Sequence, residues 1–145
     1  MKNLIYAGSS TSASVAVNGV VPITTVVRKF NRNGAKSNVD LVGNAIAIES
    51  GCTGGNCRPR YNGYALVTFA GATTGNAVLS VYEDNTTIPF ANASETIATA
   101  STEYHTVTIP FSVLCSSCST KGLTLVNTGA VGLIVINASI LVIED

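Results

Sequence analysis

Four cysteines are the residues of this sequence whose type and spacing best suit a chemical role. Four residues separate Cys52 from Cys57, and two separate Cys115 from Cys118. Both spacings fall in the range that zinc sites use, where thiolates surround the metal tetrahedrally. If strand direction alternates, the segments that carry the two pairs follow the second and sixth strands and lie at the same end of the fold. Cys52, Cys57, Cys115 and Cys118 are therefore a candidate zinc site.

Two other states of these cysteines remain open. The first is disulfide bonding, either within each pair or between the two segments. The second is four reduced thiols, which suits a chain that shows no secretion signal, because persistent disulfides are less expected without export. Intact-mass measurement with and without chelator and reductant separates the three states, and a mass unchanged by denaturation would contradict the zinc assignment.

The other chemically capable residues do not form a catalytic set. His105 is the single histidine, and it shares a face with Val107, Ile109, Phe111 and Val113. We expect no carboxylate beside it, so a satisfied core or interface histidine is favoured over a general base. No serine lies in a nucleophile-elbow motif. The adjacent pair Glu83-Asp84 is weak evidence for calcium, and the expectation is a protein that is not an enzyme.

Length and composition favour one self-associating domain. The chain has 145 residues, of which 46% are hydrophobic and 11% charged, with a formal net charge of zero. A chain with so few charges and no net charge is expected to have a surface that associates readily, because charge repulsion between copies is weak. The basic residues are too few and scattered for a nucleic-acid footprint. The sequence has no apolar run of membrane-spanning length, and the run after Lys2 is too short for a signal peptide, so synthesis in the cytoplasm is expected.

Alternating apolar residues and frequent turn residues predict an all-β fold. Tyr104 to Leu114 gives the clearest alternation, and Asn18-Gly19 between two Val-rich runs predicts a hairpin. About eight to ten short antiparallel strands, with turns every 8–12 residues, indicate a β-sandwich of jelly-roll type. Small polar residues dominate after Tyr6, so residues 1–14 are interpreted as an N-terminal arm and residues 15–145 as the jelly-roll domain.

The last strand is apolar on both faces. Its even positions are uniformly apolar and are expected to face the core: Ile134, Ile136, Ala138, Ile140 and Val142. Its odd positions are apolar at both ends and polar only at Asn137 and Ser139. A strand of this kind needs a cover on each side, and in a small all-β domain a neighbouring subunit is the expected second cover.

Formal charge is distributed unevenly along the chain. Residues 1–60 hold seven basic residues against two acidic ones, and residues 61–145 hold Lys121 alone against six acidic ones. The two parts could complement each other between subunits. The alternative is a set of ordinary solvated loops, in which exposed charges contribute little.

Several segments resemble the compact jelly-roll domains of tumour-necrosis-factor and complement-head type, in the form common among phage structural proteins. The resemblance spans about residues 40–145 and rests on a Gly-Tyr strand, a strand ending in a turn, and a terminal strand pair preceded by the segment Cys115–Cys118. The segments that carry it are Gly63–Val67, Ala77–Asp84, Gly122–Gly129 and Asn137–Ile143.

The resemblance implies a homotrimer on the surface of a virion, such as a capsid decoration or a fibre head, with the major capsid protein or another virion protein as partner. The alternative is a receptor- or glycan-binding fibre tip, although the absence of tryptophan makes a sugar platform less expected. Residues 1–14 and the basic loop Arg28–Lys36 are the expected attachment to the particle, and a solvated tail and loop are the alternative.

Overall fold

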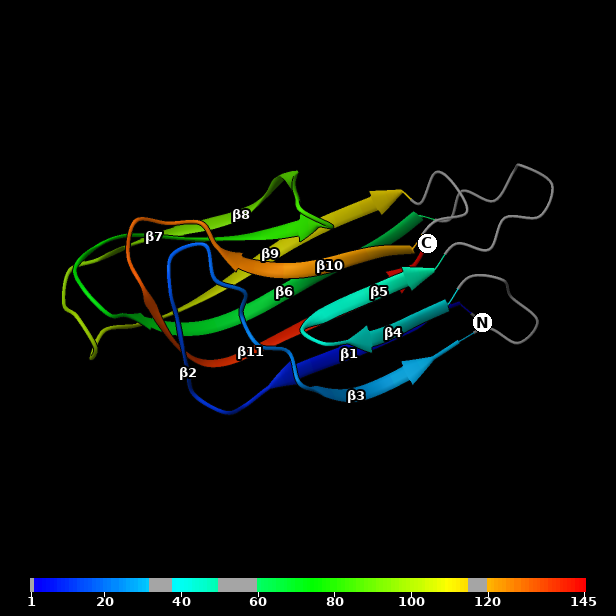
Figure 1. Cartoon of the computed structure of the whole chain (residues 1–145), viewed down its shortest axis with the longest axis horizontal. Coiled ribbons are helices and arrows are strands. Elements are labelled where there is room, and N and C mark those ends of the chain that lie inside the picture. The colour runs from blue at the N-terminus through cyan, green and yellow to red at the C-terminus, as the bar shows by residue number, and fades with distance from the viewer. Residues whose placement is uncertain (1, 32–37, 50–59, 115–119) are drawn as a thin grey trace.

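The computed structural model describes residues 2–31, 38–49, 60–114 and 120–145 as two antiparallel sheets packed face to face. Figure 1 shows them as the two layers of an elongated sandwich, with both chain termini at the same end. The expected all-β class is confirmed. The described residues form eleven strands, one more than the upper end of the expected range. Within these ranges no helix is long and apolar enough to cross a membrane.

The first sheet has the strand order β3-β1-β11-β6-β9, and β2 adds a short pairing to β11. Its strands are β1 (Leu4–Ser9), β2 (Ala13–Val15), β3 (Thr25–Phe30), β6 (Arg60–Gly71), β9 (Tyr104–Leu114) and β11 (Leu133–Glu144). β11 lies at the centre, with β1 and β2 on one side and β6 on the other.

The second sheet has the order β4-β5-β10-β7-β8. Its strands are β4 (Asn38–Val42), β5 (Ala45–Glu49), β7 (Gly75–Glu83), β8 (Thr86–Ile97) and β10 (Thr120–Asn127). β4 and β5 form a hairpin through Gly43-Asn44, where Gly43 has φ +62°. Glycine adopts this left-handed conformation without strain, which allows the tight turn between the two strands.

The core lies between the sheets and consists of the alternate residues that face inward. Phe69 and Ile109 contribute to it from the first sheet, and Ile48, Leu79 and Leu125 contribute from the second. The alternation expected for Tyr104–Leu114 is confirmed, because its odd positions from Val107 to Val113 are buried and its even positions are exposed. Burial of these side chains removes apolar area from water, which is the main driving force for the sandwich.

The expected N-terminal arm is wrong for residues 4–9. These residues form β1, which pairs with β11 on one side and with β3 on the other. Ile5 and Ala7 are fully buried, and Asn3 just before them is buried as well. The buried positions of β1 are only two, Ile5 and Ala7, and polar residues follow directly. The sequence pattern is therefore too short to identify a strand, and the strands that pair with β1 lie farther along the sequence.

The expected hairpin at Asn18-Gly19 is also wrong. The residues before it form β2, which pairs with β11 in the first sheet, whereas Val20 after it bridges Val126 in the second. Asn18 adopts φ +67°, so the Asn-Gly pair does make a tight turn. This turn connects the first sheet to the second. Backbone hydrogen bonds between Asn127 and both Asn18 and Gly19 hold the turn in place.

The prediction that the even positions of the last strand face the core is only partly right, because the register of β11 shifts within the strand. The pairing of β11 with β6 slips between Val135 and Asn137. Leu133 and Val135 therefore face the core before the slip, and Ala138, Ile140 and Val142 face it afterwards. The even-position prediction holds from Ala138 onward and fails before it, because one extra residue in a bulge exchanges the two faces of a strand.

Asn127 fixes the connection by which β10 leaves the second sheet and β11 enters the first. Its side chain is fully buried, and its Nδ2 donates to the carbonyl oxygens of Val15, at 3.2 Å, and Val131, at 2.9 Å. Its Oδ1 accepts a bond of 3.1 Å from the Gly129 backbone N–H. These bonds satisfy backbone groups that would otherwise be buried without partners.

Candidate functional site: the outward face of the first sheet

A row of large side chains crosses the outward face of the first sheet. The pairing registers place Arg28 beside Tyr6, Tyr6 beside Leu141, Leu141 beside Tyr64, and Tyr64 beside Pro110. The row therefore spans all five main strands from β3 to β9. Tyr64 is 40% exposed, and Leu141 and Tyr6 are half-buried. Neighbouring side chains on one face of a sheet touch and act as one surface.

The adjacent rows extend this surface. Leu4 pairs with Ile143, and Ile143 pairs with Asn62. On the other side of the central row, Ser139 pairs with Leu66, which pairs with Thr108. The expectation that the last strand presents apolar side chains on its second face is confirmed for Leu141 and Ile143, which lie half-buried and exposed in the single chain.

Two adjoining hollows indent this face along β1. One has a volume of about 360 Å³ and is lined by Leu4, Tyr6, Val27, Arg28, Tyr64 and Leu141. The other has a volume of about 450 Å³, and Leu66, Ser139, Thr25 and Gly8 are among its lining residues. Tyr6 and Val27 line both hollows, so we treat the pair as one feature and call it the β1 trough.

Gly8 helps to shape the β1 trough. A Cβ atom at this position would lie 2.5 Å from the carbonyl oxygen of Ala138 and 3.2 Å from the Ser139 Cα. Only glycine therefore allows β1 to lie this close to β11 here. Gly8, which has no side chain, and Ser139, which has a small one, pair with each other and leave the space that the trough occupies.

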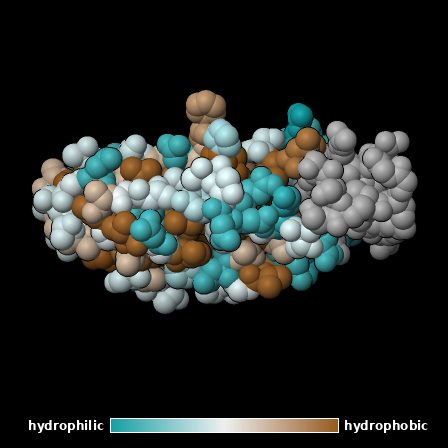
Figure 2. Space-filling model, turned by 45° about the horizontal axis from the view of Figure 1, so that its top comes forward, coloured by the Kyte–Doolittle hydropathy of each residue, from teal (hydrophilic) through white to brown (hydrophobic). Residues whose placement is uncertain are grey.

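The outward face of the second sheet differs in character. Its outward positions are mostly small or polar, with Val42 and Tyr82 as larger members: Asp40, Val42, Ala45, Ala47, Gly122, Thr124 and Tyr82. Figure 2 shows apolar residues dispersed among polar ones on the side of the molecule turned toward the viewer. The large apolar row of the first sheet is therefore the stronger candidate for contact with another protein surface.

His105 closes the edge of the sandwich between β8 and β9. Its Nε2 lies 2.7 Å from Glu103 Oε2, and its Nδ1 lies 3.5 Å from Glu95 Oε2. The ring also packs against Phe69 with centroids 6.0 Å apart. The expectation of an interface or core histidine with satisfied nitrogens therefore fits. The expectation that no carboxylate lies beside it is wrong, because Glu103, just before β9, and Glu95, in β8, both contact its ring nitrogens.

The histidine also affects the acid strength of its partner. The hydrogen bond from His105 holds the pKa of the Glu103 carboxyl below its ordinary value, and the backbone N–H of Ala98, 3.1 Å away, adds to the effect. Both bonds favour the ionised carboxylate. The arrangement ties the connection after β8 to the start of β9.

The four predicted zinc ligands lie outside the described residues, so the zinc assignment stays a prediction. The described strand ends that flank the two cysteine segments do come together. Glu49 at the end of β5 pairs with Thr120 at the start of β10, and Arg60 at the start of β6 pairs with Leu114 at the end of β9. Elsewhere, within the ranges the structure describes, no three His, Cys, Asp or Glu side chains are grouped to hold a metal ion.

Sequence reasoning misses the residues of β1 and β3 that complete the apolar face. The sequence pattern assigns Leu4 and Tyr6 to the N-terminal arm and Val27 to a Val-rich run after Asn18-Gly19. It does not predict that they share an exposed surface. The alternation of Leu4 and Tyr6 with buried Ile5 and Ala7 is the signal that could have found them. This alternation is short, and only the pairing of β1 with β11 shows that these residues lie near the centre of the sheet.

Comparison with known proteins gives no relative at the level of sequence. No family model matches the chain, and no curated protein matches it. Solved structures do match over nearly the whole length. PRD1 vertex protein P5 is 16% identical with a TM-score of 0.57, and the match covers 99% of this chain and 96% of that one.

Two further matches belong to other groups of proteins. Murine APRIL is 10% identical with a TM-score of 0.61, and each chain is covered completely. The globular domain of zebrafish complement 1qA protein is 6% identical with a TM-score of 0.53, covering 97% of this chain and 94% of that one. The chain has the jelly-roll fold of tumour-necrosis-factor and complement-head domains. The predicted fold class and resemblance are thereby confirmed.

At these identities the likeness establishes the fold and leaves the function to the surface of this chain. None of the three proteins is named for an enzymatic activity. The fold and the apolar outward face together support a structural or binding module.

Proposed function

We propose that this chain is a non-enzymatic structural protein of a phage particle and that it assembles as a homotrimer through the outward face of the first sheet. The observation that carries the proposal is the row from Arg28 to Pro110, in which large side chains cross five strands and stand partly in water in the single chain. Burying such a face contributes about 25 cal/mol per Å² of apolar area.

Two further observations support self-association. The formal net charge of zero leaves little repulsion between copies. The sandwich is also elongated (Figure 1), so three copies can pack side by side around an axis and cover the same face of each copy. Cyclic assembly accounts for apolar side chains on both faces of β11, since one face meets the core and the other meets a neighbour.

The position on a particle is proposed from the likeness to PRD1 vertex protein P5, which is named as a vertex protein. A surface position makes a capsid protein or another virion protein the partner. A receptor- or glycan-binding fibre tip is the alternative function. Stable binding to particles that lack the protein supports the structural role, and binding to cells or glycans without binding to particles supports the alternative.

Light scattering tests the assembly. The expected mass is three times the chain mass of 14.9 kDa. Leu141→Lys places a charge at the centre of the row, and it is expected to give monomers because an unpaired charge is costly in an interface. Val42→Lys, in β4 at the opposite edge of the second sheet from β8, is the control and is expected to leave the trimer intact. A monomeric native protein at micromolar concentration contradicts the proposal.

A further inference from the structure

Phe90 is displayed on an unusual bulge in β8. The pairing of β7 with β8 matches Tyr82 with Thr87 and Ser80 with Asn92. Four residues of β8 therefore stand opposite the one residue, Val81, that lies between these two pairs. A bulge of this size bends the strand and redirects a side chain.

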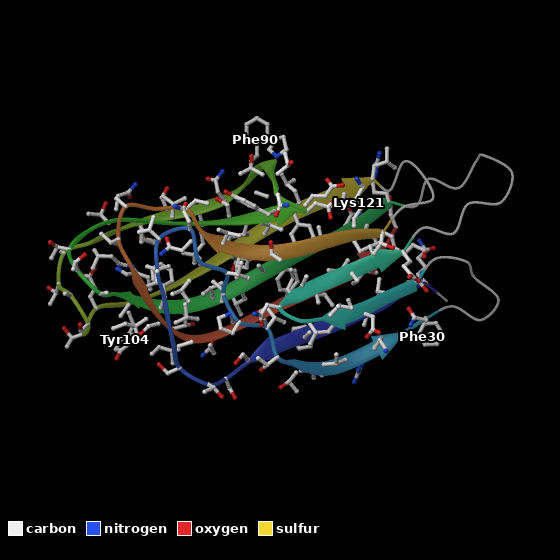
Figure 3. The ribbon with its side chains drawn as sticks, viewed as in Figure 1. Phe30, Phe90, Tyr104 and Lys121 are labelled. Carbon is white, nitrogen blue, oxygen red and sulfur yellow. The ribbon has the colours of Figure 1, made fainter. Side chains whose placement is uncertain are left out.

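The bulge points Phe90 into solvent. The residue is 95% exposed and adopts φ +65°. Figure 3 shows its ring projecting away from the ribbon. On either side of Phe90, Ala91 is buried and Ile88 packs against the core. The two ends of the bulge are therefore fixed to the sandwich, while Phe90 between them is exposed to solvent.

This conformation is unfavourable for the isolated chain in two ways. A bulky residue other than glycine is strained at positive φ, and an exposed phenyl ring leaves its apolar area in water. Glycine or asparagine would relieve both costs. An exposed aromatic ring held by a strained, anchored bulge indicates that the ring is buried in a partner.

The β1 trough suits such a ring in size and chemistry. A cavity of about 150 Å³ holds a benzene molecule, whereas the smaller hollow of the trough has about 360 Å³. Tyr6, Tyr64 and Leu141 offer aromatic and aliphatic contacts. The Arg28 side chain lines the same hollow, and a guanidinium is attracted to the face of an aromatic ring.

Phe90 and the trough belong to different parts of the chain surface. β8 is the edge strand of the second sheet, whereas the trough follows β1 and β11 on the outward face of the first. Phe90 projects away from the sandwich in Figure 3, so it does not reach the trough of its own chain. A second copy of the chain can supply the ring.

We infer that Phe90 of one copy docks in the β1 trough of the next copy. The inference rests on the proposed trimer and names the contact that closes it. A projection and a socket on different patches form a head-to-tail contact, which gives a closed ring when the rotation between copies is right. In a ring of three, each copy gives one Phe90 and receives one, so no projection is left in solvent.

The first test is Phe90→Gly. Glycine accepts φ +65° without strain, so the variant folds and its far-ultraviolet circular dichroism matches the native β spectrum. It lacks the docking ring, and we expect the dissociation constant of the trimer to rise at least about tenfold, as for other buried aromatic anchors. Val42→Ser removes another exposed apolar side chain, 62% exposed, and is expected to leave the dissociation constant unchanged.

The second test locates the ring. A photo-crosslinking phenylalanine analogue (p-benzoylphenylalanine) replaces Phe90, and mass spectrometry of the irradiated protein identifies the peptide that is joined to it. Peptides of a second copy that contain Tyr6, Val27 or Leu66 support the inference. Peptides from elsewhere overturn it.

The two proposals fail in different ways. If the native protein is a trimer and Phe90→Gly leaves its dissociation constant unchanged, the docking inference is wrong and the proposed trimer stands. If the native protein is a monomer throughout the dilution series, both are wrong. Analytical ultracentrifugation over that series distinguishes these results.

Discussion

Gly63 marks a point where the backbones of β6 and β11 approach each other closely. A Cβ atom at Gly63 would overlap the backbone carbonyl oxygen of Leu141, and it would lie 3.0 Å from the Phe111 ring. Leu141 in turn holds the centre of the apolar row. One glycine therefore keeps β6 and β11 close enough for Tyr64 and Leu141 to form a continuous outward surface.

Gly63→Ala is expected to lower the free energy of unfolding by about 1–3 kcal/mol, as for other overpacked core sites. Backbone atoms cannot rotate away, so the two strands must separate. Gly122→Ala in β10 is the control: its Cβ would meet nothing closer than 3.8 Å, and it is expected to be neutral or slightly stabilising. Urea unfolding of both variants measures the difference. Equal stabilities would contradict this account of the strand contact.

Glu103 predicts how stability depends on acid pH. Its pKa in the folded chain is lower than the ordinary value of 4.5 because of the hydrogen bond from His105. The ionised carboxylate therefore stabilises the fold at neutral pH, and this contribution is lost as the pH falls through the folded-state pKa, below 4.5. The Glu103 side chain is 30% exposed, so solvent screens its interaction with His105 and the effect is small.

The comparison variant is Glu103→Gln, which keeps the shape of the side chain without its charge. The native protein is expected to be more stable than the variant at about pH 6, and the difference is expected to shrink toward about pH 3. Thermal unfolding across this pH range measures it. A difference that stays constant with pH would show that the charge of Glu103 does not contribute.

At the scale of elements, β1 decides whether the first sheet is complete. It lies between β3 and β11, so its backbone pairs on both sides. Without it, β3 loses its partner in the sheet and one side of β11 loses most of its hydrogen bonds. The same strand carries Leu4 and Tyr6 on the outward face, so it contributes both to the core and to the proposed interface.

A chain that begins at Val15 is expected to lose cooperative folding. The deletion removes the buried side chains Ile5 and Ala7 together with two rows of backbone pairing. Truncation at Asn3, which removes only two residues, is the control and is expected to unfold like the full-length chain. Thermal unfolding followed by circular dichroism compares the two. A stable trimer from the chain beginning at Val15 would restore the interpretation of residues 1–14 as an arm.

The sequence correctly predicts those elements of the fold whose pattern lies within a single stretch of residues. The alternation from Tyr104 to Leu114 identifies β9 and its inward face correctly, because one strand carries the whole signal. The bulge in β11 and the sheet change after Asn18-Gly19 are settled by pairing with distant residues. The apolar face is predictable from β11, but the β1 trough needs the register of β1, β11 and β6, which no single segment specifies.

At the scale of the whole molecule, two sets of surface ion pairs each join residues from the same part of the chain. Lys29 lies 3.1 Å from Asp40, and both belong to the basic part, residues 1–60. Lys121 lies 3.7 Å from Glu83 and 3.7 Å from Asp84 in the acidic remainder. Such exposed pairs contribute little to stability, and they do not require the two parts to complement each other between subunits.

The proposed trimer is therefore expected to be insensitive to salt. Apart from Arg28, the row across the first sheet is uncharged: Tyr6, Leu141, Tyr64 and Pro110. Burial of apolar area does not weaken with ionic strength, whereas attraction between exposed charges is screened within about 10 Å at 0.1 M salt. Between about 0.05 M and about 0.5 M sodium chloride, the dissociation constant is expected to change less than about threefold. Sedimentation at several salt concentrations measures it. Weakening by a factor of about ten or more would show instead that the basic part of one subunit holds the acidic part of the next.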